Sequence, residues 1–316
     1  MSTKKKIYAI INPKSGTSSK QNFPYRLAET FDARKFDVHI FITGYAGHGS
    51  EIAGQAIEDK ADYVIAVGGD GTVNEVARTL VNSNTALGII PLGSGNGLAR
   101  DLNISTDAKK AMGVILDGNI ISIDYGMVNG RIFFCTCGVG FDAEVAAMAS
   151  GKKSRGSFMY LKNMLETFIR QKPETYEITC PEGTIKDKAL VVTCANASQY
   201  GYNAHIAPHA DIQDGMMNIA ILKPLSILDV PQTSLQLFTK KIDENNKMID
   251  LVTNEAIIKR EREGLMHIDG ESVKTGREIH VKIIPGGLKV LVPENPPKKN
   301  PLDPQEILMR IADTFF

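Results

Sequence analysis

The stretch Asp62-Tyr-Val-Ile-Ala-Val-Gly-Gly-Asp-Gly-Thr-Val-Asn-Glu-Val-Ala-Arg-Thr-Leu80 joins an apolar run, a glycine turn and an amphipathic segment. Residues 63–67 are apolar and predict a buried strand. After the turn, apolar residues recur with the i, i+3, i+4, i+7 spacing of a helix: Val73, Val76, Ala77 and Leu80. Thr72 is the expected N-cap, and Glu75 three residues later completes a capping box. The stretch therefore predicts a strand, a tight turn and a helix.

The turn Gly68-Gly69-Asp70-Gly71 combines features of a phosphate site with an acidic side chain. Glycines let the backbone come close to a ligand, and the first N–H groups of the helix suit a phosphate. Asp70 repels that phosphate unless a cation or a substrate hydroxyl lies between them. The combination indicates phosphoryl transfer, with Asp70 as a catalytic or magnesium-linked carboxylate.

Strand-like and helix-like segments alternate as far as about residue 105, which predicts a doubly wound parallel sheet covered on both faces. In such sheets, ligands bind beyond the C-terminal ends of the strands. Further polar loops fall at those ends: Asn12-Pro13-Lys14-Ser15-Gly16, Thr43 and Gly93-Ser94-Gly95-Asn96. Together with the turn around Asp70, they predict one nucleotide-binding edge. Each loop alone is equally typical of an ordinary strand-to-helix connection.

The pattern changes near residue 120, where short strand-like runs follow one another and Asn129-Gly130 predicts a hairpin. We expect an α/β nucleotide-binding domain over residues 1–122 and an antiparallel β-sandwich over 123–295. Helices are expected over 158–169 and over 225–240, the second interrupted at Pro231. A terminal helix over 303–316 is expected to dock, with the first domain as one candidate surface.

Composition excludes several classes of protein. The 316 residues carry 36 basic and 36 acidic side chains, so the formal net charge is zero and no basic field indicates nucleic acid. Four cysteines in apolar surroundings indicate a reducing compartment, and Cys135-Thr-Cys137 is typical of core packing. We find neither a signal peptide nor an apolar run of the ~18 residues that a membrane span requires.

Acidic residues in the second half supply further candidates. Asp211 and Asp214 flank a turn that is either a solvated β-turn or, with a backbone carbonyl, an oxygen-ligand cation site. Asp269-Gly270-Glu271 is either a plain turn or the carrier of a general base, Glu271. The stretch Gly138 to Ala143 matches GxGxxA, which is either a dinucleotide fingerprint or, as favoured here, a structural turn. Asp142 and Glu144 are acidic groups at the same strand end. The histidines lack metal-ligand spacing and are interpreted as packing or surface residues.

Taken together and in this order, the motifs resemble the diacylglycerol kinase catalytic-domain superfamily, which includes bacterial lipid kinases and the sphingosine and ceramide kinases. The motifs are Asn12 to Gly16, Gly68 to Glu75, Pro91 to Arg100, Asp211 to Gly215 and Asp269 to Glu271. The resemblance covers nearly the whole chain. It implies an α/β domain, a β-sandwich and an active site in the cleft between them.

The resemblance also implies roles for individual residues. ATP phosphates would lie on Asn12, Pro13, Lys14, Ser15 and Gly16 and on the second loop, with Gly68, Gly69, Gly71, Thr72 and Asn74. Thr43 and Ser94 would also contact the nucleotide, with Asn96 and Glu144 near the substrate. Mg²⁺ is implied near Asp70, and a structural Mg²⁺ on Asp211, Asp214 and the carbonyl of Met216. Bacterial members use the acid at position 271 as base, whereas sphingosine kinases favour the one at position 70.

One departure concerns position 97. Bacterial diacylglycerol kinases usually have an Asn-Asp pair in the third loop, whereas this chain has Asn96-Gly97. The diacylglycerol-type metal and water network would therefore lack its acid at position 97. Glu144 does not discriminate between sphingoid and glycerolipid substrates.

The sequence thus predicts an ATP- and Mg²⁺-dependent kinase of a lipid alcohol, diacylglycerol-like or sphingoid. Its alternatives are a soluble-metabolite kinase of the NAD-kinase or phosphofructokinase type and a non-catalytic lipid- or nucleotide-binding regulator. We expect a cytoplasmic protein that contacts the inner membrane surface transiently and binds no nucleic acid. A homodimer is compatible with the sequence. The basic residues Lys152, Lys153 and Arg155 are expected either to meet anionic phosphates or to form a solvated loop.

Overall fold

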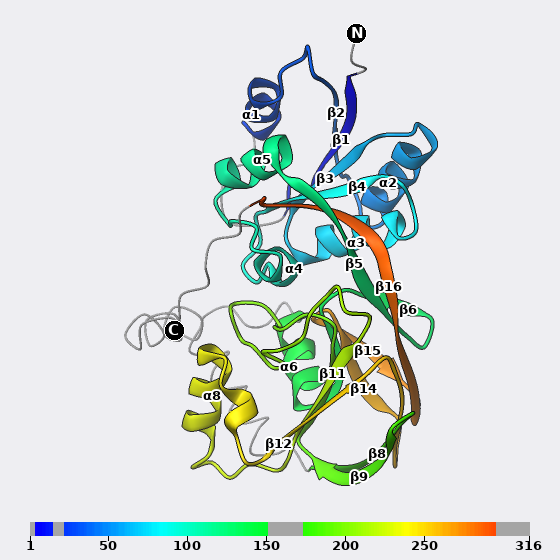
Figure 1. Cartoon of the computed structure of the whole chain (residues 1–316), viewed down its shortest axis with the longest axis vertical. Coiled ribbons are helices and arrows are strands. Elements are labelled where there is room, and N and C mark those ends of the chain that lie inside the picture. The colour runs from blue at the N-terminus through cyan, green and yellow to red at the C-terminus, as the bar shows by residue number, and fades with distance from the viewer. Residues whose placement is uncertain (1–3, 15–21, 151–172, 295–316) are drawn as a thin grey trace. The chain divides into compact units, whose positions relative to one another are not determined.

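The computed structural model describes residues 4–14, 22–150 and 173–294, which fall into two compact units (Figure 1). Of these, residues 4–14, 22–124 and 285–294 belong to the first unit, and residues 125–150 and 173–284 belong to the second. Residues 285–294, which the sequence analysis places with the second domain, thus group with the first. Several predicted features lie outside the described residues: Ser15, Gly16, the basic residues at 152–155, and the helices over 158–169 and 303–316.

The first unit is built on a parallel sheet with the strand order β2-β1-β3-β4. The end of β16 adds a further parallel strand, since Val290 pairs with Leu87 of β4. Strands β3 and β4 are buried along their whole length, as their apolar sequences require. The strand bounds are Lys5–Ile11 for β1, Phe36–Ile42 for β2, Tyr63–Gly68 for β3, Ala86–Pro91 for β4 and Glu278–Val292 for β16.

Helices lie on both faces of this sheet (Figure 1). Helices α2 and α3 pack together on one face, and Thr30 of α1 contacts Met112 of α5 on the other. The helix bounds are Phe23–Thr30 for α1, His48–Glu58 for α2, Asp70–Leu80 for α3, Gly97–Asp101 for α4 and Ala108–Asp117 for α5. Strand β2 lies on one side of β1 in the sheet and β3 on the other, so the strand order reverses direction at β1. The crevice between the ends of β1 and β3 is therefore the expected ligand position in a sheet of this kind.

The second unit consists of two antiparallel sheets. One is six-stranded, with the order β12-β11-β10-β7-β14-β15, and the other joins β16, β13, β8 and β9, with β5 pairing with β16 and β6. The bounds are Asn119–Val128 for β5, Arg131–Phe133 for β6, Thr136–Gly140 for β7, Glu174–Cys180 for β8, Gly183–Ala189 for β9, Val191–Ala195 for β10, Met217–Leu222 for β11, Met248–Thr253 for β12, Glu255–Arg260 for β13, Gly264–Ile268 for β14 and Glu271–Thr275 for β15.

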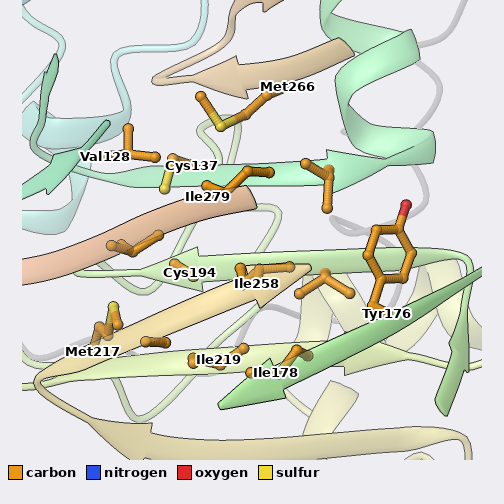
Figure 2. Close-up of a cluster of buried hydrophobic side chains, with 14 of the residues drawn as sticks. Val128, Cys137, Tyr176, Ile178, Cys194, Met217, Ile219, Ile258, Met266 and Ile279 are labelled. Atoms are coloured by element: carbon orange, nitrogen blue, oxygen red, sulfur yellow. The ribbon is translucent and has the colours of Figure 1, made fainter. Parts of the chain in front are cut away.

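Apolar side chains from both sheets form one core, which Figure 2 shows in close-up. Met217 and Ile219 come from the six-stranded sheet, whereas Ile178 and Ile258 come from the other. The predicted β-sandwich is therefore confirmed. Cys137 also lies in this core, where burial raises the pKa of its thiol well above the ordinary value. Such a thiol is inert, in keeping with the predicted packing role.

Several predicted elements differ from the observed ones. The helix over 225–240 begins only at α8, Val230–Thr239, where Pro231 occupies the first turn and does not interrupt it. A proline is tolerated there because the first N–H groups of a helix have no partner within it. After the hairpin, two separate strands, β6 and β7, follow one another, and β16 continues across Pro285. A short 3₁₀ helix, η1, spans Ile242–Glu244, and α6 spans Phe141–Ser150.

The predicted hairpin at Asn129-Gly130 is present. Both residues have positive φ, 46° and 79°, and they join β5 to β6 as a two-residue turn. This backbone conformation matches the twist of the flanking strands and favours asparagine followed by glycine. A local sequence signal was sufficient here because the turn depends on two adjacent residues.

Candidate active site

The loop after β1 is connected to the first turn of α3. Asn12 donates from Nδ2 to the Thr72 hydroxyl at 3.0 Å, and its Oδ1 accepts the backbone N–H of Lys14 at 2.9 Å. The Asn12 N–H reaches the carbonyl of Val67 in β3 at 3.1 Å. Pro13 and Lys14 are exposed. Two of the predicted phosphate loops thus meet at the C-terminal ends of β1 and β3.

The turn after β3 starts α3 without a side-chain cap. Gly69 is the N-cap, and Thr72 lies inside the first turn, so the predicted N-cap at Thr72 is wrong. Gly68 must lack a side chain, because a Cβ there would lie 2.5 Å from Thr72 Oγ1. Gly71 is exposed, whereas Asn74 is buried with 4% of its surface exposed.

Glu75 does not form the predicted capping box. Its Oε1 accepts the backbone N–H groups of Gly49 at 2.7 Å and Ser50 at 3.2 Å, both in the first turn of α2. The Ser50 hydroxyl donates to the Glu75 carbonyl at 3.1 Å. A carboxylate is favourable at a helix N-terminus, where N–H groups lack partners. Glu75 therefore caps the neighbouring helix and not its own.

Asp70 caps another neighbouring helix. Its Oδ2 accepts the N–H of Asn96 at 2.8 Å and its Oδ1 accepts that of Gly97 at 2.7 Å, at the start of α4. The Asn96 side chain closes the loop by accepting the N–H of Gly93 at 3.1 Å and donating to the Gly93 carbonyl at 2.7 Å. A Cβ at Gly93 would lie 2.6 Å from the Gly69 Cα. The loops after β3 and β4 are thus in direct backbone contact.

The loop after β2 lies beside the one after β1. Thr43 donates its N–H to the Ile11 carbonyl at 2.9 Å, and Gly44 donates to His48 Nδ1 at 3.1 Å. Thr43 is partly exposed and Ser94, in the loop after β4, is exposed. The described part of the first unit therefore brings all four predicted loops to one edge of the sheet.

The candidate cation site of the second unit consists of two adjacent Asx turns. Asp211 Oδ1 accepts the N–H of Gln213 at 3.0 Å, and Asp214 Oδ1 accepts that of Met216 at 2.9 Å. Both aspartates are exposed. Within the described ranges, no group of three or more His, Cys, Asp or Glu side chains is placed to hold a metal. Two carboxylates and a carbonyl are nevertheless the oxygen donors that Mg²⁺ prefers, with water completing its shell.

Glu271 begins β15, directly after a two-residue turn. Asp269 and Gly270 both have positive φ, 48° and 81°, and join β14 to β15. The Asp269 carboxylate accepts three backbone N–H groups at 2.8–3.1 Å, those of Phe134, Cys135 and Thr136. Asp269 is therefore structural, whereas Glu271 is exposed. The spacing of Asp269 and Glu271 along the chain does not separate these two roles.

Glu144 is exposed on the first turn of α6, and its neighbour Asp142 turns inward to His267. His267 Nε2 lies 2.9 Å from Asp142 Oδ2, and the His267 side chain is 2% exposed. The prediction that His267 is a packing or surface residue did not include this pair. The two residues are 125 positions apart, so no local spacing reveals them.

Two family models match the chain. The diacylglycerol kinase catalytic domain matches residues 6–128, and the YegS C-terminal NAD kinase beta sandwich-like domain matches residues 135–292. The chain belongs to the YegS family. Relatives named "Probable lipid kinase YegS" include one from Escherichia fergusonii, 30% identical over 267 residues, which cover 82% of this chain and 88% of the relative. Another from Salmonella arizonae is 29% identical over 296 residues, covering 91% and 96%.

Solved structures agree with this YegS-family membership at the level of the fold. A diacylglycerol kinase from Bacillus anthracis matches with a TM-score of 0.73 at 20% identity, covering 92% of this chain and 97% of that one. An NAD kinase from Archaeoglobus fulgidus, in complex with ATP, matches with a TM-score of 0.51 at 12% identity, covering 91% and 94%. The family models confirm the predicted superfamily, and the solved structures confirm the fold class. Among the described helices of this YegS-family chain, none has the length and apolar character to cross a bilayer.

Proposed function

We propose that this protein is an ATP-dependent lipid kinase that transfers the γ-phosphate of ATP to the hydroxyl group of a lipid alcohol. The main support is the edge of the sheet where α2, α3 and α4 begin. The first N–H groups of α2 and α4 are hydrogen-bonded to Glu75 and Asp70, whereas α3 starts without a side-chain cap. The start of α3 therefore suits a phosphate best.

The loop after β1 supports the same position for the nucleotide. Asn12 is hydrogen-bonded to Thr72 in the first turn of α3, and the exposed Lys14 follows it. An ammonium group there would neutralise phosphate oxygens during transfer. The ATP complex of the NAD kinase with this fold supports ATP as donor. Thr43 and Ser94 are proposed contacts of the nucleotide from the flanking loops.

Glu271 is the proposed proton acceptor. Each carboxylate oxygen of Asp70 already accepts a backbone N–H, so Asp70 is proposed chiefly to hold the third loop. The lipid hydroxyl oxygen attacks the γ-phosphorus while the bond to the bridging β,γ-oxygen breaks. The hydroxyl proton passes to the Glu271 carboxylate, which is exposed at the start of β15. ADP and a phosphorylated lipid are the products.

Magnesium fits the donor atoms at both proposed positions. Each Asp70 oxygen keeps a lone pair beyond its N–H bond, and Asp211, Asp214 and the Met216 carbonyl are all oxygen donors. Mg²⁺ held by Asp70 near the phosphates would supply charge neutralisation, whereas at the second position it would hold a turn. We expect the first ion to be required for transfer and the second for stability.

A lipid acceptor requires contact with a membrane surface, and we propose that this contact is peripheral and transient. The relatives named as lipid kinases support this assignment. The test is sedimentation with vesicles containing anionic lipid, in which the protein is expected to co-sediment at low salt and to be released at high salt.

The decisive experiment is transfer of label from γ-³²P-ATP to a panel of acceptors. Diacylglycerol, monoacylglycerol and sphinganine are supplied in mixed micelles, and NAD⁺ is supplied in buffer. Label in the organic phase with one lipid supports the proposal. Label only in the aqueous phase with NAD⁺ identifies a soluble-metabolite kinase instead. Binding of ATP without transfer to any acceptor identifies a non-catalytic regulator.

A further inference from the structure

A buried acid–imidazole pair lies in the second unit, outside the residues assigned to catalysis. Asp142 Oδ2 and His267 Nε2 are 2.9 Å apart, and their side chains are 10% and 2% exposed. Asp142 belongs to the first turn of α6, which packs against β7, β14 and β15. His267 belongs to β14.

A glycine makes room for this pair. Thr193 of β10, Gly138 of β7 and His267 of β14 are directly opposite one another in the ladder, so they share one face of the sheet. Gly138 leaves a gap in that row, and the Asp142 carboxylate lies in it. A Cβ at position 138 would lie 2.7 Å from Asp142 Oδ2 and 2.9 Å from His267 Nε2.

Further donors satisfy the Asp142 carboxylate. Thr193 Oγ1 donates to Oδ2 at 2.7 Å, and Tyr200 donates from its hydroxyl at 3.3 Å. The Thr193 and Tyr200 hydroxyl oxygens are themselves 2.7 Å apart. Burial, followed by the charge of Asp142, raises the pKa of Tyr200 well above its ordinary value, so it remains a phenol and a donor. The Tyr200 and His267 rings pack edge to face at 5.8 Å.

His267 of the pair belongs to the β14–β15 hairpin that carries Glu271. His267 is paired in register with Ser272, the residue after Glu271. At the turn, Asp269 holds the same hairpin through three backbone N–H groups. We propose that Asp142 and His267 are positioning residues that fix the β14–β15 hairpin and thereby the carboxylate of Glu271. This inference rests on the proposed role of Glu271 as proton acceptor.

The energetics favour a role in geometry over one in stability. Taking a carboxylate and an imidazole out of water costs free energy that their hydrogen bond barely returns, and apolar replacements of buried polar pairs are often as stable. A satisfied polar network does, however, permit one arrangement of its members and excludes others. The hairpin beside it gains a defined position, which a proton acceptor needs to within a fraction of an ångström.

The first test compares two substitutions of His267. His267→Leu removes the donor and is expected to lower kcat roughly 10²-fold with an unchanged KM for ATP. His267→Gln is expected to restore most of the activity, because its amide N–H can donate to Asp142. The matched control is His205→Asn in the same unit, since His205 is also buried and its Nδ1 is hydrogen-bonded to Ser198. This control is expected to leave kcat unchanged.

A double-mutant cycle with Glu271→Gln separates this inference from the proposed function. If the pair acts through Glu271, His267→Leu costs no further activity in the Glu271→Gln background. The same fold loss in both backgrounds, or wild-type kcat in His267→Leu alone, overturns the inference. A fully active Glu271→Gln enzyme instead overturns the proposed role of Glu271.

Hydrogen exchange gives a readout that needs no catalysis. The amides of residues 265–275 are expected to exchange faster in His267→Leu and at wild-type rates in His205→Asn. If His267→Leu does not fold, Thr193→Val replaces it, because it removes one donor to Asp142 at similar volume. Faster exchange confined to the hairpin supports the inference, and unchanged exchange there overturns it.

Discussion

The Asp70 carboxylate accepts a hydrogen bond of 2.7 Å from the backbone N–H of Gly97, and this contact ties the turn after β3 to the first residue of α4. The neighbouring N–H of Asn96 reaches the other oxygen at 2.8 Å. The resemblance to bacterial diacylglycerol kinases implies an acid at position 97, where this chain has glycine. In this chain Gly97 donates its backbone N–H to Asp70. The acid of the loop after β3 therefore fixes the loop after β4.

Asp70→Asn is expected to weaken this connection. The amide has one acceptor oxygen and places an NH₂ group against the second N–H, so about 1–2 kcal/mol of unfolding free energy is lost. We expect kcat to fall at least ~10²-fold while ATP still binds at α3. Urea unfolding, calorimetry and the transfer assay measure the three quantities. Asp62→Asn is the control, since the exposed Asp62 accepts one backbone N–H, that of Lys6; an equal loss of activity there would contradict the assignment.

Glu75 substitutions are expected to give a graded loss of stability. Glu75→Ala removes the acceptor for Gly49 and Ser50, at a cost of about 1 kcal/mol. Glu75→Gln retains an oxygen that can accept both bonds, so it loses only the charge term of a few tenths of a kcal/mol. Chemical denaturation measures both. Equal losses in the two variants would show that charge, and not the hydrogen bonds, accounts for the effect.

Gly138→Ala is expected to destabilise the protein by about 1–3 kcal/mol, because the added methyl group would overlap the Asp142 and His267 side chains. Gly54→Ala is the matched control. Gly54 lies inside α2 with open space around its Cα, so alanine is expected to raise stability by about 0.5–1 kcal/mol through helix propensity. The unfolding temperatures of the two variants should therefore shift in opposite directions. A Gly138→Ala protein as stable as the wild type would show that the space at Gly138 is not filled by the Asp142 carboxylate.

Tyr8 and Asp59 are expected to make stability depend on pH at the alkaline end. Hydrogen bonding to Asp59 and burial raise the pKa of Tyr8 to about 12. A raised pKa favours the protonated folded state, so this contribution is complete below pH 10 and is lost as the pH rises from about 10 to 12. Unfolding free energies of the wild type and Tyr8→Phe should converge over that range. A constant difference between them would contradict the assignment.

Local patterns predicted much of the first unit. The apolar runs of β3 and β4 and the i, i+3, i+4, i+7 spacing of α3 depend on neighbouring residues, and both predictions were confirmed. The polar strands were harder to predict. Strand β9, Gly183–Ala189, is exposed over most of its length and resembles a loop in composition. Its pairing with β8 places it in the sheet, and that pairing has no signature in its own sequence.

The sequence alone determined the alternating strands and helices of the first unit and the hairpin at Asn129-Gly130, because these depend on residues close together in the chain. It also indicated that four loops share one edge, because parallel strands end at the same edge of a sheet. Only the tertiary structure decided which carboxylate binds which partner. Glu75 caps α2 at a separation of 26 residues, and Asp142 meets His267 at a separation of 125. Hydrogen bonds depend on distances in space, which the folded backbone sets and the spacing of residues along the chain does not.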